Sequence, residues 1–189
     1  MQDQAGAALT RATLTPFALV AAACLVADQA SKVWALRSLD DGHVVPLLGD
    51  LLSLRLIRNP GAAFSLGGSS TLVMTGLAVV ITVVVAVAAW RTRSVGWALS
   101  LGALFGGSLG NLYDRFFREP APGKGHVIDF IDYGGLFVGN IADVAIVIGA
   151  VGLLWLSLSD VGLDGVKGGR HARAGEEPGV VGAKGEDHA

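Results

Sequence analysis

Hydrophobic residues fall in four long runs along the chain, and short polar segments separate these runs. The runs over residues 71–90 and 94–113 contain no charged residue. The runs over 14–36 and 140–159 are similarly long but have a few charged residues toward one end. A helix of roughly 20 apolar residues crosses about 30 Å of hydrocarbon. The pattern therefore predicts an all-α membrane protein with four transmembrane helices.

The polar segment between the first two runs has a different periodicity. Residues 52–57 alternate between leucine and other side chains, directly after the turn-forming pair Gly49–Asp50. This alternation predicts a short β-hairpin or small sheet. Residues 160–189 are rich in glycine and charge, which is typical of a disordered tail. We therefore expect an N-terminal segment over 1–13, a membrane domain over 14–159 and a tail over 160–189.

The loop between the second and third runs consists only of residues 91–93. In a chain with four spans, this loop and both termini must share one side of the membrane. The remaining polar residues then meet at the opposite surface, although they are far apart in the sequence. Lysine and arginine are equally numerous on the two sides, so the positive-inside rule does not orient the chain.

The composition supports a membrane protein and excludes some other classes. The chain is 52% hydrophobic and 16% charged, with a mean hydropathy of +0.56. The net charge is −2 and no long basic run is present, so we expect no nucleic-acid partner. The single cysteine, Cys24, cannot form an internal disulfide and is interpreted as a thiol within the first span.

Three pairs of polar residues have spacings that place each pair on one helix face. Asp28 and Lys32 are four residues apart, Asn111 and Arg115 are four apart, and Asn140 and Asp143 are three apart. An ordinary explanation exists for each, namely an ion pair extending to water, a helix end among headgroups, and a helix cap. However, each ionisable group at membrane depth costs about 2.5 to 3.5 kcal/mol on insertion scales, so a cluster of them indicates a functional site.

Carboxylates dominate this cluster. Asp129 and Asp132 precede the fourth run and Asp143 lies near its start. Two neighbouring carboxylates share a proton, and the ionised one can then activate water while the protonated one stabilises an oxyanion. The chain contains no HExxH motif and no Cys/His cluster, which gives a metalloprotease little support.

Residues 106–110, GGSLG, match the G-x-S-x-G pattern of a serine hydrolase. That pattern needs a strand–turn–helix context, whereas Ser108 lies inside an apolar run. Gly102, Gly106 and Gly110 are spaced by four residues, so we favour close helix packing for this segment. His126 has no second histidine at ligand spacing and is interpreted as a loop residue.

Five motifs resemble, in order and spacing, the lipoprotein signal peptidase (signal peptidase II) family. They are DQASK (28–32), NPGAAFS (59–65), GGSLGNLYDR (106–115), GHVIDFID (125–132) and NIADVAI (140–146). The resemblance implies a four-helix aspartyl peptidase of the bacterial inner membrane with an extracytoplasmic β-cradle. It implies cleavage on the N-terminal side of a diacylglyceryl-modified cysteine, with the active site near the extracytoplasmic face and both termini in the cytoplasm.

Carried over by motif, the catalytic dyad is Asp129 and Asp143. The residues implied to bind substrate or support the site are Asp28, Lys32, Asn59, Gly61, Asn111, Asp114, Arg115 and Asn140, with Asp114 and Asp132 as secondary members. The implied partners are diacylglyceryl-modified prolipoproteins and membrane lipids, and we expect a monomer without metal or other cofactor. We also expect Gly61, Ala62, Ala63 and Gly139 to line the substrate pocket.

The chain departs from the family pattern at two places. Gly139 stands where many relatives have Phe, and residues 116–124 are longer than in some relatives and could form an additional flap. Two other functions are compatible with membrane carboxylates: a transporter or proton channel, and a non-catalytic lipid-binding or assembly protein. A transporter would need a polar path through the second and third runs, which the sequence lacks.

Overall fold

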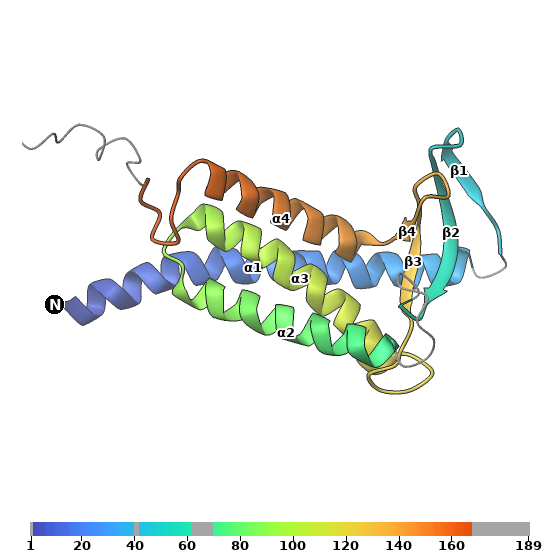
Figure 1. The fold of residues 1–189 in the computed structure, drawn as a ribbon, viewed down its shortest axis with the longest axis horizontal. Helices are drawn as coiled ribbons and strands as arrows, with labels where there is room; N and C mark the ends of the chain where they lie inside the picture. The colour runs from blue at the N-terminus through green and yellow to red at the C-terminus, as the bar shows by residue number, and fades with distance from the viewer. Residues whose placement is uncertain (1, 40–41, 62–69, 168–189) are drawn as a thin grey trace, which may run out of the picture.

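A computed structural model describes residues 2–39, 42–61 and 70–167. Within these residues, four helices form a bundle with a small sheet at one end (Figure 1). The helices are α1 (Gln2–Ser38), α2 (Ser70–Arg91), α3 (Val95–Phe117) and α4 (Ile141–Leu158). All of them are long and apolar enough to cross a membrane, α1 over Ala12–Ser38. The predicted spans are confirmed, although α1 begins earlier than its apolar run.

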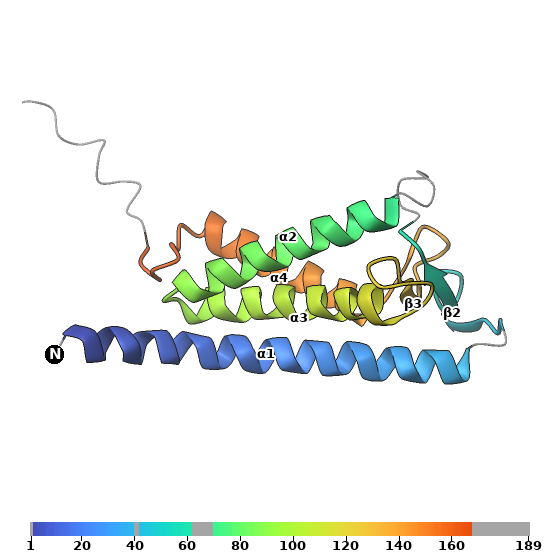
Figure 2. The same cartoon turned by 90° about the horizontal axis from the view of Figure 1, so that it is seen from below.

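Helix α3 lies at the centre of the bundle and packs against the other helices (Figure 2). Its glycines permit this close approach. A Cβ atom at Gly102 would lie 2.7 Å from the carbonyl oxygen of Phe17 on α1, and one at Gly107 would lie 2.5 Å from that of Ala142 on α4. The packing role expected for the glycine-rich segment is therefore confirmed. Ser108 is buried within this helix, far from any strand–turn–helix elbow.

The sheet has the order β1-β2-β3-β4 and is antiparallel throughout the described residues. Strands β1 (Val45–Leu48) and β2 (Leu52–Asn59) form the predicted hairpin. Strands β3 (Val127–Asp132) and β4 (Val138–Gly139) were not predicted, because their apolar residues merge with the approach to the fourth run. Phe130 of β3 packs against Ala35 and Leu39, which fixes the sheet to the end of α1.

The first residues of the predicted tail have a defined structure. Residues 160–167 form a turn closed by a bridge between Val161 and Lys167. The indole of Trp97 donates to the carbonyl of Val161 at 3.0 Å, and the hydroxyl of Thr92 donates to that of Leu163 at 2.9 Å. This turn is thus fixed to the start of α3, while residues 168–189 lie outside the described part.

Candidate active site

A buried lysine joins α1 to α3 at the sheet end of the bundle. The Nζ atom of Lys32 lies 2.9 Å from a carboxylate oxygen of Asp28 and 2.7 Å from one of Asp114. It also donates to the side-chain oxygen of Asn111 at 3.0 Å. These three partners match the three donors of an ammonium group, so its charge is compensated although the side chain is inaccessible to water.

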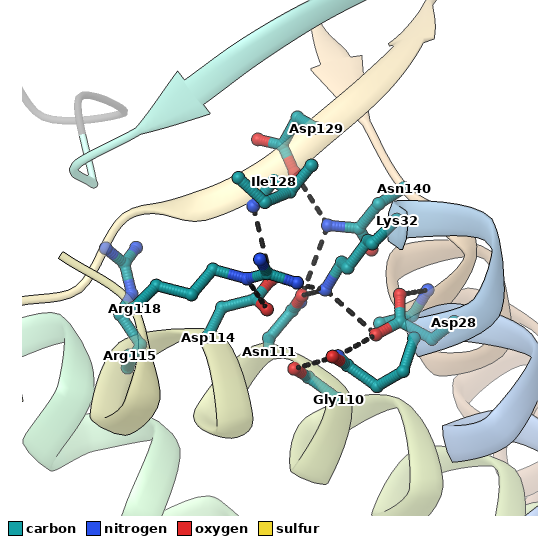
Figure 3. A network of polar contacts seen from close by, with 12 residues as sticks. Asp28, Lys32, Gly110, Asn111, Asp114, Arg115, Arg118, Ile128, Asp129 and Asn140 are labelled. Carbon is teal, nitrogen blue, oxygen red and sulfur yellow. Dashed lines mark hydrogen bonds and ion pairs between the residues drawn. The ribbon is translucent and has the colours of Figure 1, made fainter. Parts of the chain in front are cut away.

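Asp114 connects this cluster to the sheet (Figure 3). Its Oδ2 atom accepts from Lys32 and, at 3.2 Å, from the backbone N–H of Ile128 in β3, while its Oδ1 atom accepts from Arg118. Asp114 is completely buried. Because the same carboxylate bonds α1, α3 and β3, it sets the position of the strand that carries Asp129.

Amide groups hold both members of the predicted dyad. Asp129 accepts from Asn59 at 2.8 Å through one oxygen and from Asn140 at 2.6 Å through the other. Asp143 accepts from the side chain of Asn111 at 2.9 Å and from the backbone N–H of Asn140 at 3.1 Å. Every oxygen of the two carboxylates therefore has an amide donor, and Asn140 bonds both residues.

The start of α4 explains the placement of Asp143. Asn140 caps the helix and Asp143 completes a reciprocal capping box with it. Asp28 adds a further acceptor, because its Oδ1 atom accepts from the backbone N–H of Ala142 at 3.0 Å. The helix cap and the candidate site are thus built from the same residues, so the capping explanation is confirmed and the functional one stays a prediction.

Burial makes Asp129 a weak acid. Its pKa is raised from the ordinary value of 3.8 to about 6, chiefly because desolvation penalises the ionised form. Repulsion from Asp143 adds to the rise, whereas hydrogen bonds from Asn59 and Asn140 and the charge of Lys32 oppose it. Asp129 is only 3% exposed, while Asp143 is partly accessible. The two carboxylates therefore differ in their access to water.

Arg115 closes the side of the site next to β2. One of its Nη groups donates to the backbone carbonyls of Asn59 at 3.2 Å and Gly125 at 3.0 Å. The side-chain oxygen of Asn59 in turn accepts from the N–H of Gly61 at 2.8 Å. Arg115 thereby holds the end of β2 near Asp129.

An apolar groove opens directly beside Asp143. Its volume is about 320 Å³, and its lining consists of Tyr133, Phe137, Asp143, Val144, Val147 and Ile148. The rings of Tyr133 and Phe137 are stacked, with centroids 4.6 Å apart. A Cβ atom at Gly139 would lie 2.8 Å from the Phe137 ring and 2.9 Å from a carboxylate oxygen of Asp143. The ring of Phe137 therefore occupies the space beside Gly139.

A family model described as signal peptidase (SPase) II matches residues 20–159. The chain belongs to the signal peptidase II family. It is therefore a peptidase of the aspartic type, and its apolar helices make it a multi-pass membrane protein.

Several signal peptidase II relatives are similar over most of their length. The lipoprotein signal peptidase of Rhodococcus jostii (strain RHA1) is 44% identical over 151 residues, covering 80% of this chain and 76% of the relative. That of Mycobacterium avium (strain 104) is 43% identical over 155 residues, covering 82% and 84%. A bacterial membrane enzyme solved at 1.9 Å has a TM-score of 0.66 and 24% identity over 75% of this chain and 92% of its own. This structural likeness shows the fold.

The structure brings the described residues of the family motifs together at one end of the bundle. Asp114 was expected to be secondary but lies at the centre of the buried network, whereas Asp132 pairs with Arg55 at 3.0 Å.

Arg118 and the stacked rings of Tyr133 and Phe137 were not predicted from the sequence. The spacing of Arg118 four residues after Asp114 could have indicated the former. Ala62 and Ala63 of the expected pocket lie outside the described residues.

Hydrogen bonds anchor the segment that follows α3. The N–H of Gly125 bonds to the carbonyl of Arg115 at 3.0 Å, and that of His126 bonds to Glu119 at 2.9 Å. Thr75 on α2 donates to the carbonyl of Gly123 at 2.8 Å. These bonds fold the loop compactly between α3 and β3, and His126 lies in it as expected.

Proposed function

We propose that this chain removes signal peptides from diacylglyceryl-modified prolipoproteins by cutting on the N-terminal side of the lipidated cysteine, with Asp129 and Asp143 as the catalytic dyad. The relatives named above are lipoprotein signal peptidases, which supports this substrate class. The observation that carries the dyad assignment is the shared amide framework. Asn140 bonds both carboxylates, and the raised pKa of Asp129 makes one shared proton favourable.

The unequal surroundings assign a role to each carboxylate. Asp129, which is more deeply buried, retains the shared proton, and Asp143 acts as the base. Asp143 accepts a proton from water as the water oxygen attacks the scissile carbonyl carbon, and Asp129 donates a hydrogen bond to the developing oxyanion. The proton on Asp143 then passes to the leaving amide nitrogen as the C–N bond breaks.

The apolar groove supports a substrate that arrives from the lipid. Its wall includes Val144, Val147 and Ile148 in the first turns of α4, and the last two are exposed. An acyl chain or an apolar side chain fits such a lining better than a polar group does. We infer that the sheet end of the bundle is extracytoplasmic and that both termini are cytoplasmic, as in the family.

The test is cleavage of a diacylated prolipoprotein by the purified protein in detergent micelles. We expect Asp129→Asn and Asp143→Asn each to abolish cleavage while the protein still inserts and purifies, because an amide neither accepts the water proton nor shares it. Asp132→Asn is the matched control, since Asp132 bonds Arg55 outside the dyad framework. Near-normal turnover by either dyad variant would refute the assignment.

A further inference from the structure

A second cavity lies beside β3 but on the face opposite the dyad. Its volume is about 460 Å³, and its lining is Leu36, Arg58, Phe117, Arg118, Glu119, Pro120, His126 and Ile128. Consecutive strand residues point to opposite faces, so Ile128 faces this cavity while Asp129 faces the candidate active site. The peptidase mechanism uses none of this space.

Positive charge predominates in the lining. Arg58 comes from β2, where it pairs in register with Ile128, and Arg118 directly follows α3. Arg118 uses Nε to bond Asp114, but a guanidinium carries five N–H donors, so its Nη groups can bond a second anion. The imidazole of His126 also lines the cavity, and Glu119 is the acidic residue of this lining. Because the two arginines outnumber the one acid, the cavity suits an anionic group.

One side of the cavity is apolar and lies at the ends of two membrane spans, α1 and α3. Leu36 is in the last turn of α1 and Phe117 is the last residue of α3. Phe117 is 74% exposed, and its ring packs against Tyr113 at a centroid distance of 4.9 Å. Tyr113 is also exposed, and tyrosine rings near the end of a span are typical of the depth of lipid headgroups. A charged group bound here would therefore lie beside acyl chains.

We propose that this cavity binds the headgroup of an anionic phospholipid. The phosphate lies between Arg58, Arg118 and His126, and the acyl chains extend along Leu36 and Phe117. Guanidinium groups bind phosphate through paired hydrogen bonds, and basic pockets between spans suit anionic headgroups. This inference is independent of the proposed function, because it uses no residue of the dyad.

The experiment is a lipid titration of the purified full-length protein followed by native mass spectrometry. The probes are phosphatidylglycerol, phosphatidylethanolamine and phosphatidylcholine with identical acyl chains. We expect at least about fivefold preference for phosphatidylglycerol over both zwitterionic lipids, which corresponds to about 1 kcal/mol. Equal binding of phosphatidylglycerol and either zwitterionic lipid would overturn the proposal.

Charge substitutions test the location of the lipid. Arg58→Gln should remove the preference for phosphatidylglycerol, and Glu119→Gln should increase it because the exposed carboxylate repels the headgroup. Arg37→Gln is the matched control, since Arg37 is an exposed base in the last turn of α1 but does not line the cavity. An equal loss in Arg37→Gln and Arg58→Gln would show general surface attraction and contradict the site. If Arg58→Gln does not fold, an unchanged preference in Glu119→Gln likewise contradicts it.

Discussion

Asp129 and Asp143 are identical side chains in unequal surroundings. Asp129 lies in a strand and is almost fully buried, whereas Asp143 lies in the first turn of α4 and borders an open groove. Desolvation favours the neutral form of a carboxyl group, and a neighbouring negative charge does the same. In the proposed mechanism, this difference in environment is what separates acid from base, since the residue type is the same.

We expect kcat/KM to fall as pH rises through an apparent pKa of about 6, because the active dyad needs the proton on Asp129. The same proton affects stability. The folded-state pKa of Asp129 lies above its ordinary value of 3.8. Its contribution to the free energy of unfolding is therefore complete below about pH 3.8 and is lost as pH rises through about 6. A profile of kcat/KM against pH, recorded with a diacylated substrate, measures the first effect. An activity that rises through this range would contradict the assignment of the acid to Asp129.

A side chain added at Gly139 would contact Asp143, the proposed base. In Gly139→Ala, the new methyl group meets the Phe137 ring and an oxygen of Asp143, and both are side-chain ends that can move. We expect kcat/KM to fall at least about tenfold, or 1.4 kcal/mol, with little change in melting temperature. The double variant with Phe137→Ala should recover part of the loss. Gly76→Ala on α2, where a Cβ meets nothing within 4 Å, is the control.

Among the helices, α3 packs most extensively against the others, because its glycines allow neighbouring backbones to approach closely. Gly106 brings α3 so close to α1 that a Cβ atom there would lie 2.9 Å from the Cα of Ala21 and from the Cβ of Cys24. Lys32 on α1 bonds Asn111 on α3, and Asn111 bonds Asp143 on α4. A change in the distance between α1 and α3 would therefore shift Asn111 and, with it, the carboxylate of Asp143.

We expect Gly106→Ala to lower the free energy of unfolding by about 1 to 3 kcal/mol, since backbone atoms must separate to admit the methyl group. Thermal unfolding in detergent measures this loss, and cleavage activity should fall with it. The control is again Gly76→Ala, which adds the same methyl group to an exposed position of another span. Equal stability of both variants would contradict close packing between α1 and α3.

At the scale of the whole molecule, the candidate site lies where the helix bundle meets the sheet. Asp143 is in the first turn of a span, and three other residues of that span help to line its groove. A peptide bond cleaved there must be held against a substrate helix that could slide along the membrane normal. Each buried CH₂ group is worth about 0.8 kcal/mol, and stable anchoring generally takes two acyl chains.

We therefore expect strong discrimination for a diacylglyceryl-modified cysteine over an unmodified one in the same precursor. Values of kcat/KM for the two matched substrates, measured in the same micelles, provide the comparison. A ratio below about tenfold, or 1.4 kcal/mol, would mean that the lipid does not position the scissile bond. The wild-type protein and Asp132→Asn should show the same ratio, since Asp132 lies outside the dyad framework.

Elements that form through local interactions are predictable from the amino-acid pattern alone. Apolar runs of span length predict helices in any bilayer protein, and the leucine alternation over 52–57 predicts the hairpin. The sequence also predicts which polar residues belong to the site. Charged groups at membrane depth are costly, so the few that occur within apolar runs indicate a functional site. Strands β3 and β4 could not be predicted in this way. Strand β3 pairs with β2, which is distant in the sequence, and β4 has only two residues.

The hydrogen bonds and ion pairs among these residues depend on how distant elements pack. Spacing along one helix pairs Asp28 with Lys32, but not Lys32 with Asp114 or Asn140 with Asp129, which come from different elements. Phe137 lies near Gly139 by its spacing of two residues, but its stacking on Tyr133 depends on the turn between β3 and β4. Desolvation also depends on every surrounding atom, so the raised pKa of Asp129 required the assembled fold.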